Sequence, residues 1–175
     1  AAGNDHDAVA AKPADVGSGT GAVIKLSHDM GLTVGAGIEE ISSNSGNDPE
    51  HQNVTAYALY TMGPVSIGYQ GYYLDTGTSA LAGASPTADY SGDALGIAFN
   101  VNDQVSIGYQ KVSEDKEARA GTAGVTRDIK SISAAYSTGG MTMSIQSTDT
   151  DNSTMAAAAS ELDVEAVQVT LSFAF

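Results

Sequence analysis

The sequence contains no cysteine and no tryptophan, and only 4 proline and 3 phenylalanine residues among 175. Without cysteine, a disulfide scaffold and a thiolate metal site are both excluded. Leucine and phenylalanine are also scarce, whereas glycine is abundant, with 20 residues. This composition is poor material for a thick hydrophobic core, and no shift along the chain indicates a second domain.

Positive charge is equally scarce, because 7 lysines and arginines stand against 21 aspartates and glutamates, a net charge of −14. Proteins that bind nucleic acid rely on clustered lysine and arginine to neutralise phosphates. Nucleic acid is therefore excluded as a partner, and cations or solvent are favoured.

Long apolar runs are missing too. No stretch reaches the roughly 18 apolar residues of a transmembrane helix, and residues 1–17 lack the basic and apolar regions of a signal peptide. A membrane location stays open, because closed barrels cross bilayers with alternating strands of about 10 residues.

What the sequence does contain is period-two alternation of apolar and polar residues. The segments LTVGAGIE (32–39), VSIGYQ (65–70) and MTMSIQ (141–146) each place apolar residues on one face and small polar residues on the other. The pattern predicts nine strands, near residues 22–29, 31–42, 53–62, 64–75, 90–101, 104–114, 127–138, 140–149 and 161–175.

The connections between these strands alternate between tight turns and long polar loops. Tight turns are expected at 29–31, 62–64, 100–103 and 138–140, and long loops near 43–52, 76–89, 115–126 and 150–160. Outer-membrane barrels have this order, with turns in the periplasm and loops outside. A soluble sandwich has no reason for it and also needs bulkier inward side chains.

The motif VSIGYQ occurs twice, at 65–70 and at 105–110, each time directly after a tight turn. About two strands fit between the copies, whereas a propeller blade needs four. The repeat therefore favours equivalent hairpins over a propeller.

The last nine residues, VQVTLSFAF (167–175), alternate apolar side chains up to an aromatic end. They resemble the signal by which bacterial outer-membrane proteins are recognised for assembly, carried by Val167, Val169, Leu171, Phe173 and Phe175. The whole chain resembles the C-terminal part of Gram-negative general porins of the α-proteobacterial type. The resemblance implies an outer-membrane location, passive diffusion of small hydrophilic solutes and ions, a homotrimer, contact with lipid and lipopolysaccharide, and insertion by the barrel assembly machinery.

The number of strands also predicts the direction in which the first strand crosses the membrane. If the last strand runs toward the periplasm, the first of nine strands also runs inward and starts outside. We therefore expect an all-β, antiparallel, up-and-down transmembrane barrel, of which residues 22–175 are the C-terminal strands of a 16-stranded barrel. Residues 1–21 are then expected to form the last part of an extracellular loop.

Candidate functional residues follow from the expected faces. Lys25, Asp29 and Glu39 are predicted to line the pore, where charged groups bias which ions enter; the acidic balance predicts a cation-leaning channel. Amphipathic tyrosines are expected in the girdles at the headgroup level, namely Tyr57, Tyr60, Tyr69, Tyr72, Tyr109 and Tyr136.

No cofactor and no enzymatic activity are predicted, because the three histidines accompany no catalytic motif. Acidic residues expected in loops could gather Ca²⁺; they are Asp48, Glu50, Glu114, Asp115, Glu117, Asp149, Asp151 and Glu161. Two alternatives to a pore stay open: a structural or adhesive surface β-protein, and a small complete barrel that acts as an enzyme or binding protein.

Overall fold

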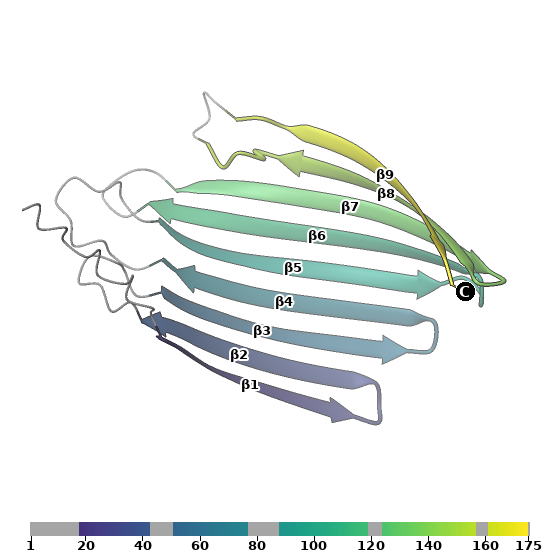
Figure 1. Ribbon diagram of the computed structural model, residues 1–175, viewed down its shortest axis with the longest axis horizontal. Helices are drawn as coiled ribbons and strands as arrows, with labels where there is room; N and C mark the ends of the chain where they lie inside the picture. The colour runs from purple at the N-terminus through teal and green to yellow at the C-terminus, as the bar shows by residue number, and fades with distance from the viewer. Residues whose placement is uncertain (1–17, 43–50, 77–87, 119–123, 157–160, 175) are drawn as a thin grey trace, which may run out of the picture.

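The computed structural model describes residues 18–42, 51–76, 88–118, 124–156 and 161–174, which form one sheet of nine antiparallel strands. The strands lie side by side in chain order (Figure 1). They are β1 (Ser18–His28), β2 (Leu32–Ser42), β3 (His51–Met62), β4 (Val65–Asp75), β5 (Ala88–Asn100), β6 (Val105–Ala118), β7 (Val125–Thr138), β8 (Met141–Asp151) and β9 (Val164–Phe173).

The expected all-β, up-and-down arrangement with nine strands is confirmed. The observed strand boundaries differ from the predicted ones mostly at the strand ends that face the long connections. β1 begins at Ser18 instead of residue 22, and β6 continues to Ala118 instead of 114. Polar residues extend these strands because cross-strand backbone pairing continues there, as in the pairs Ser18 with Ser42 and Asp89 with Glu117.

Four tight turns join β1–β2, β3–β4, β5–β6 and β7–β8 at the same end of the sheet. In the β7–β8 turn, Gly139 and Gly140 both have positive φ, 52° and 83°, as a two-residue hairpin turn of type I′ requires. In the β5–β6 turn, the Asn102 side-chain oxygen accepts hydrogen bonds from the backbone N–H groups of Gln104 (2.8 Å) and Val105 (2.9 Å). These turns fix the register of each hairpin.

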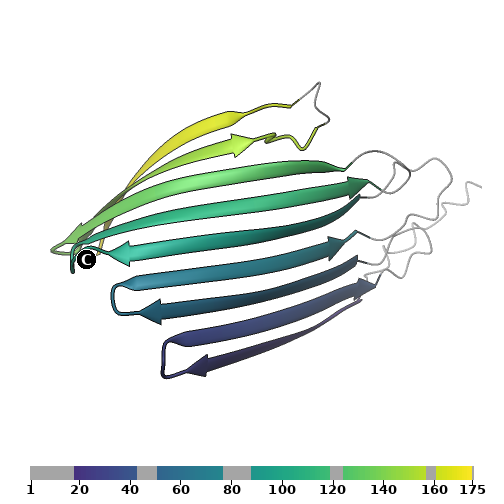
Figure 2. The same ribbon diagram turned by 180° about the vertical axis from the view of Figure 1, so that it is seen from behind.

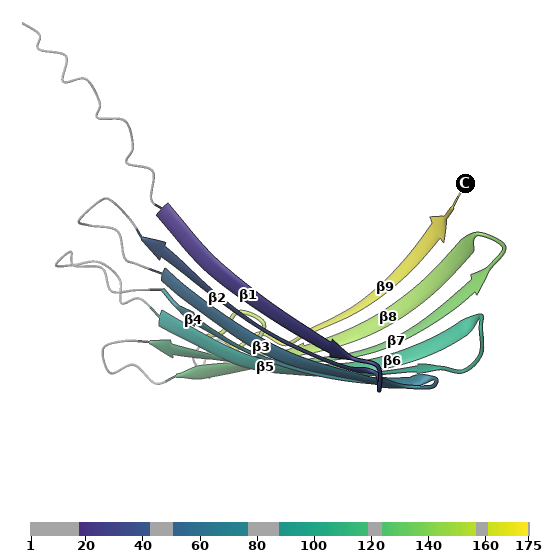
Figure 3. The same ribbon diagram turned by 90° about the horizontal axis from the view of Figure 1, so that it is seen from below.

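The sheet is curved along its width into an open trough. Figure 3 shows β1 and β9 at the two raised edges with the other strands between them, and Figure 2 shows the same sheet from behind. Each strand pairs solely with its neighbours in the described sequence, so β1 and β9 each leave one edge without a strand partner among the described residues.

The register separates two faces of the sheet. Residues paired across strands share a face, and the face alternates along each strand. One continuous row runs through Thr33, Leu59, Gly68 and Gly96 and belongs to the face rich in small polar residues. The neighbouring row, through Leu32, Tyr60, Ile67 and Ile97, belongs to the apolar face.

The polar face is the concave one. Side chains on the inner side of a curved sheet converge and screen one another, whereas those on the outer side spread apart. On β7, the polar-face Ser131 is 9% exposed, and its neighbour Ile132 on the apolar face is 65% exposed. The apolar face is therefore the convex, outward face.

The described residues contain almost no packed core. Met155 is the one buried apolar side chain among them, and large apolar side chains lie exposed along the convex face of all nine strands. No helix in the described residues is long and apolar enough to cross a bilayer. A sheet of this kind gains little stability from its own interior, and its apolar face needs a covering medium.

Candidate functional site: the concave polar wall

Hydroxyl groups pair across neighbouring strands all along the concave face. Ser27 with Thr33 (3.1 Å), Thr61 with Ser66 (3.0 Å), Ser131 with Thr148 (3.0 Å) and Ser137 with Thr142 (2.9 Å) lie within hydrogen-bond distance. Each hydroxyl keeps further donor or acceptor capacity after such a pair forms. The wall can therefore bind water and uncharged polar groups.

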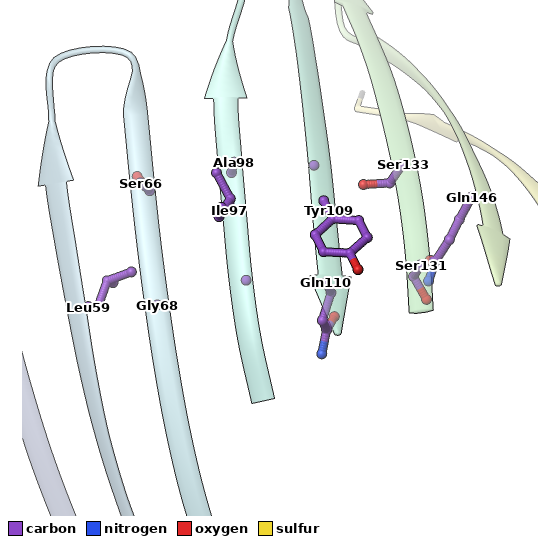
Figure 4. Close-up of a pocket in the computed structure, with 12 residues that line it drawn as sticks. Leu59, Ser66, Gly68, Ile97, Ala98, Tyr109, Gln110, Ser131, Ser133 and Gln146 are labelled. Carbon is purple, nitrogen blue, oxygen red and sulfur yellow. The ribbon is translucent and has the colours of Figure 1, made fainter. Parts of the chain in front are cut away.

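A hollow of about 340 Å³ lies in the middle of the trough (Figure 4). Its lining comes from β3 to β8 and includes Ser66, Gln110, Ser133 and Gln146, all on the polar face. Glycines of three neighbouring strands, Gly68, Gly96 and Gly108, also line it, and small side chains keep the hollow open.

A cluster of three side chains bridges the wall near the ends of the strands opposite the tight turns. The hydroxyl of Tyr72 on β4 donates to Glu114 on β6 (2.6 Å), and Arg127 Nη2 on β7 donates to the same carboxylate (3.0 Å). The Glu114 and Arg127 side chains are 17% and 28% exposed. We call these three residues the mouth cluster.

The mouth cluster reaches past β5 because Gly92 lies between its members. Gly92 pairs with Tyr72 on one side and with Glu114 on the other, and a Cβ at this position would collide with the Tyr72 ring. The missing side chain lets the phenol cross over β5 to the carboxylate. The sequence pattern alone gave no sign of this contact, because the two residues are 42 positions apart.

The segment after β8 braces the same region. Asn152 is 6% exposed. Its side-chain N–H groups donate to the backbone oxygens of Thr126 (3.1 Å) and Ala156 (3.0 Å). Arg127 Nη1 donates to the Ser153 carbonyl at 3.5 Å. Asn152 and Met155 adopt positive φ, 52° and 49°; asparagine tolerates this left-handed conformation well, whereas for methionine it is uncommon.

Of the predicted pore-lining residues, Lys25 and Glu39 lie on the concave face, where Lys25 pairs with Gly35 and Glu39 accepts a hydrogen bond from Asn53 (3.1 Å). Asp29 lies in the β1–β2 turn, outside the strands, and is not part of the wall. The prediction missed Glu114, Lys116 and Arg127, which share this face.

The predicted tyrosine girdle divides between the two faces. Tyr60, Tyr69, Tyr109 and Tyr136 lie on the convex face, so their girdle role stays a prediction. The assignments of Tyr57 and Tyr72 were wrong: Tyr57 pairs with Gly35 and Tyr72 with Thr55, both on the polar face. Their phase along the strand could have shown this, because Tyr57 follows Asn53 and Thr55 at intervals of two.

The acidic residues proposed for Ca²⁺ do not gather. Among the described residues, no group of three or more histidine, aspartate or glutamate side chains could hold a metal ion. Glu114 and Asp115 face opposite sides of β6 because neighbours in a strand alternate. Asp48 and Glu50 lie outside the described residues.

The convex face is apolar over the part of each strand nearer the tight turns and acidic near the strand ends that face the long connections. On β4 it is apolar from Val65 to Tyr73, which is about 26 Å along a strand at about 3.3 Å per residue and about 20 Å after a tilt of about 40°. That height is close to the apolar band of about 25 Å in transmembrane barrels. Val167, Val169, Leu171 and Phe173 of the terminal segment continue the apolar face on β9, and Phe175 lies outside the described residues.

No family model and no curated protein matches the sequence. Among solved structures, the chain is similar to OmpT, an outer-membrane protein of Vibrio cholerae that was folded in vitro, with a TM-score of 0.68 and 14% sequence identity. The match covers 86% of this chain and 53% of the OmpT chain, so this chain spans about half of that protein's length. The fold of the nine strands is thus similar to part of an outer-membrane β-barrel, whereas the finer resemblance to α-proteobacterial general porins stays a prediction.

Proposed function

We propose that this chain forms part of an outer-membrane channel through which small hydrophilic solutes and ions diffuse passively. The observation that carries the proposal is the reversal of the usual faces: a concave wall of paired hydroxyls, glycines and glutamines opposite a convex apolar band. Water-filled barrels place polar residues inside and apolar residues toward lipid. The likeness of the fold to an outer-membrane protein supports the location.

The wall is suited to general diffusion rather than to tight binding of one solute. Its hydroxyl pairs are spread from Ser27 at one edge to Thr148 on β8. Specific ligand sites instead combine an enclosed, largely apolar cavity with a few convergent polar groups. Water and small polar molecules can exchange along such a wall without a deep free-energy minimum.

A channel also requires closure of the sheet. Unpaired backbone groups at β1 and β9 would be costly in a lipid environment, because no water is available to bond them. We propose that further strands complete the ring, in agreement with the expected 16-stranded barrel. The trimeric state and the assembly role of the β9 segment belong to this same proposal.

The test is single-channel recording in a planar bilayer, with the protein extracted from the outer membrane of the producing cell. Stepwise, steady conductance increases are the expected result. Insertion with heat-modifiable gel migration but without steps would contradict the pore and favour a structural or adhesive barrel.

A further inference from the structure

The net charge of the sequence predicts a cation-leaning pore, but the register sorts the charges by face. On the concave face of the described strands, the charged residues are Lys25, Glu39, Glu114, Lys116 and Arg127. Basic side chains therefore outnumber acidic ones on the wall that faces the solute path, although acidic residues dominate the whole chain threefold.

The acidic excess of the strands lies on the convex face, near the ends opposite the tight turns. Lys111 and Lys130 are the basic residues of that face in the described strands. The acidic ones are Glu40, Asp75, Asp89, Asp93, Asp115, Glu117, Asp128, Asp149, Asp151 and Glu165. These groups point away from the trough, with the sheet between them and the solute path.

Within the mouth cluster, the positive charge of Arg127 and the negative charge of Glu114 largely neutralise each other. Arg127 Nη2 and Glu114 Oε1 are 3.0 Å apart, and both side chains are largely shielded. A close pair of opposite charges has a weak field at a distance. Lys25, Lys116 and Glu39 are left as the wall charges without an ion-pair partner among the described residues.

The two lysines lie at opposite ends of the solute path. Lys25 is close to the tight turn that follows β1, and Lys116 is close to the far end of β6. A fixed charge acts across water over about 8 Å at physiological salt, so each lysine influences the part of the lumen beside it. The sheet lies between the charges of the convex face and that path, and the solvent on the convex side screens these charges.

We infer that the wall formed by β1 to β9 favours anions through Lys25 and Lys116, and that the acidic residues of the convex face do not contribute to ion selectivity. This inference rests on the proposed pore. It concerns the contribution of this wall, which is measured by the change that each substitution causes in the permeability ratio.

The test is the reversal potential of single channels under a KCl gradient. Glu39 and Glu40 provide a matched pair, because they are the same residue type, adjacent on β2 and on opposite faces. We expect Glu39→Gln to lower the ratio of cation to anion permeability by roughly 1.5- to 2-fold, the effect of one charge about 10 Å away in water when salt screens it over about 8 Å, and Glu40→Gln to leave it unchanged. Lys25→Gln with Lys116→Gln should raise the ratio by at least as much.

Heat-modifiable migration confirms that each variant is folded. Equal shifts for Glu39→Gln and Glu40→Gln, or an unchanged ratio in the double lysine variant, would overturn the inference while leaving the pore intact. Absence of conductance steps in the unsubstituted protein would overturn the pore itself and the inference with it. A second control variant, Asp128→Asn on the convex face of β7, repeats the comparison on a different strand and should also leave the ratio unchanged.

Discussion

Gly35 and Tyr57 form a pair in which one residue makes room for the other. They are register partners on the concave face of β2 and β3, and a Cβ on Gly35 would overlap the Tyr57 ring. The tyrosine ring therefore lies over the backbone of β2, along the concave wall, instead of projecting away from it. Aromatic residues placed over glycine in this way cover a backbone that has no side chain of its own.

We predict that Gly35→Ala lowers the free energy of unfolding by about 1–3 kcal/mol, because the added methyl group displaces the ring. Adding Tyr57→Ala should remove most of this penalty, so the two changes should be strongly non-additive. Denaturant titration in detergent micelles measures both. Gly96→Ala is the control, since nothing lies within 4 Å of a Cβ there; a penalty equal to that at Gly35 would contradict the steric explanation.

A second prediction concerns the mouth cluster. Arg127→Met leaves the shielded Glu114 carboxylate with Tyr72 as its remaining donor, and we expect a loss of about 1–3 kcal/mol in unfolding free energy. Lys130→Met breaks an ion pair with Asp151 whose side chains are 45% and 52% exposed, so a much smaller loss is expected, because solvent screens the pair. Thermal unfolding of the two variants under identical conditions compares them. Similar losses would show that shielding of the mouth cluster does not matter.

At the scale of the strand, alternation made the fold predictable. Period-two patterning and turn residues indicated the number, order and pairing of the strands, because each of these depends on local sequence. The mouth cluster depends instead on register across β4, β5 and β6, and no local pattern of Tyr72 or Glu114 indicates it. The residue type of Tyr57 also led to a wrong prediction, because a tyrosine ring is compatible with either the apolar or the polar face of a sheet.

The face assignment gives a third prediction, on adjacent residues of β8. Ile145 lies on the convex face and Gln146 on the concave face. Ile145→Lys puts a charge into the apolar band and should cost about 2–4 kcal/mol near the bilayer midplane, whereas Gln146→Lys meets water. The yield of folded protein in lipid vesicles, read by heat-modifiable migration, tests this. Equal yields for both variants would argue that the convex face is not in lipid.

At the scale of the whole molecule, the absence of cysteine permits a direct map of the two faces. Single cysteines at Ser66 and Ile67, neighbours on β4, point to the concave and convex faces respectively. We predict that a water-soluble maleimide labels Ser66→Cys in intact membranes and spares Ile67→Cys. Labelling of both sites after denaturation is the control, and preferential labelling of Ile67→Cys in membranes would reverse the assignment of the faces.

The two edges of the sheet restrict how the ring can close. β1 and β9 both end at the tight-turn end, since Ala174 N–H bonds to Gly140 O at 2.7 Å beside the β7–β8 turn. Two strands with the same direction pair only in parallel. Antiparallel closure therefore takes an odd number of further strands between β9 and β1, a condition that a 16-stranded ring satisfies.

The strict nearest-neighbour order of the strands also has a bearing on how such a protein can change over time. Each described strand pairs only with the strands next to it in the chain, so each hairpin contacts the rest of the sheet through its two flanking strands alone. The duplicated VSIGYQ begins β4 and β6, at the same place in successive hairpins. Gain or loss of one hairpin during evolution would alter the circumference of the sheet while every surviving register stayed intact.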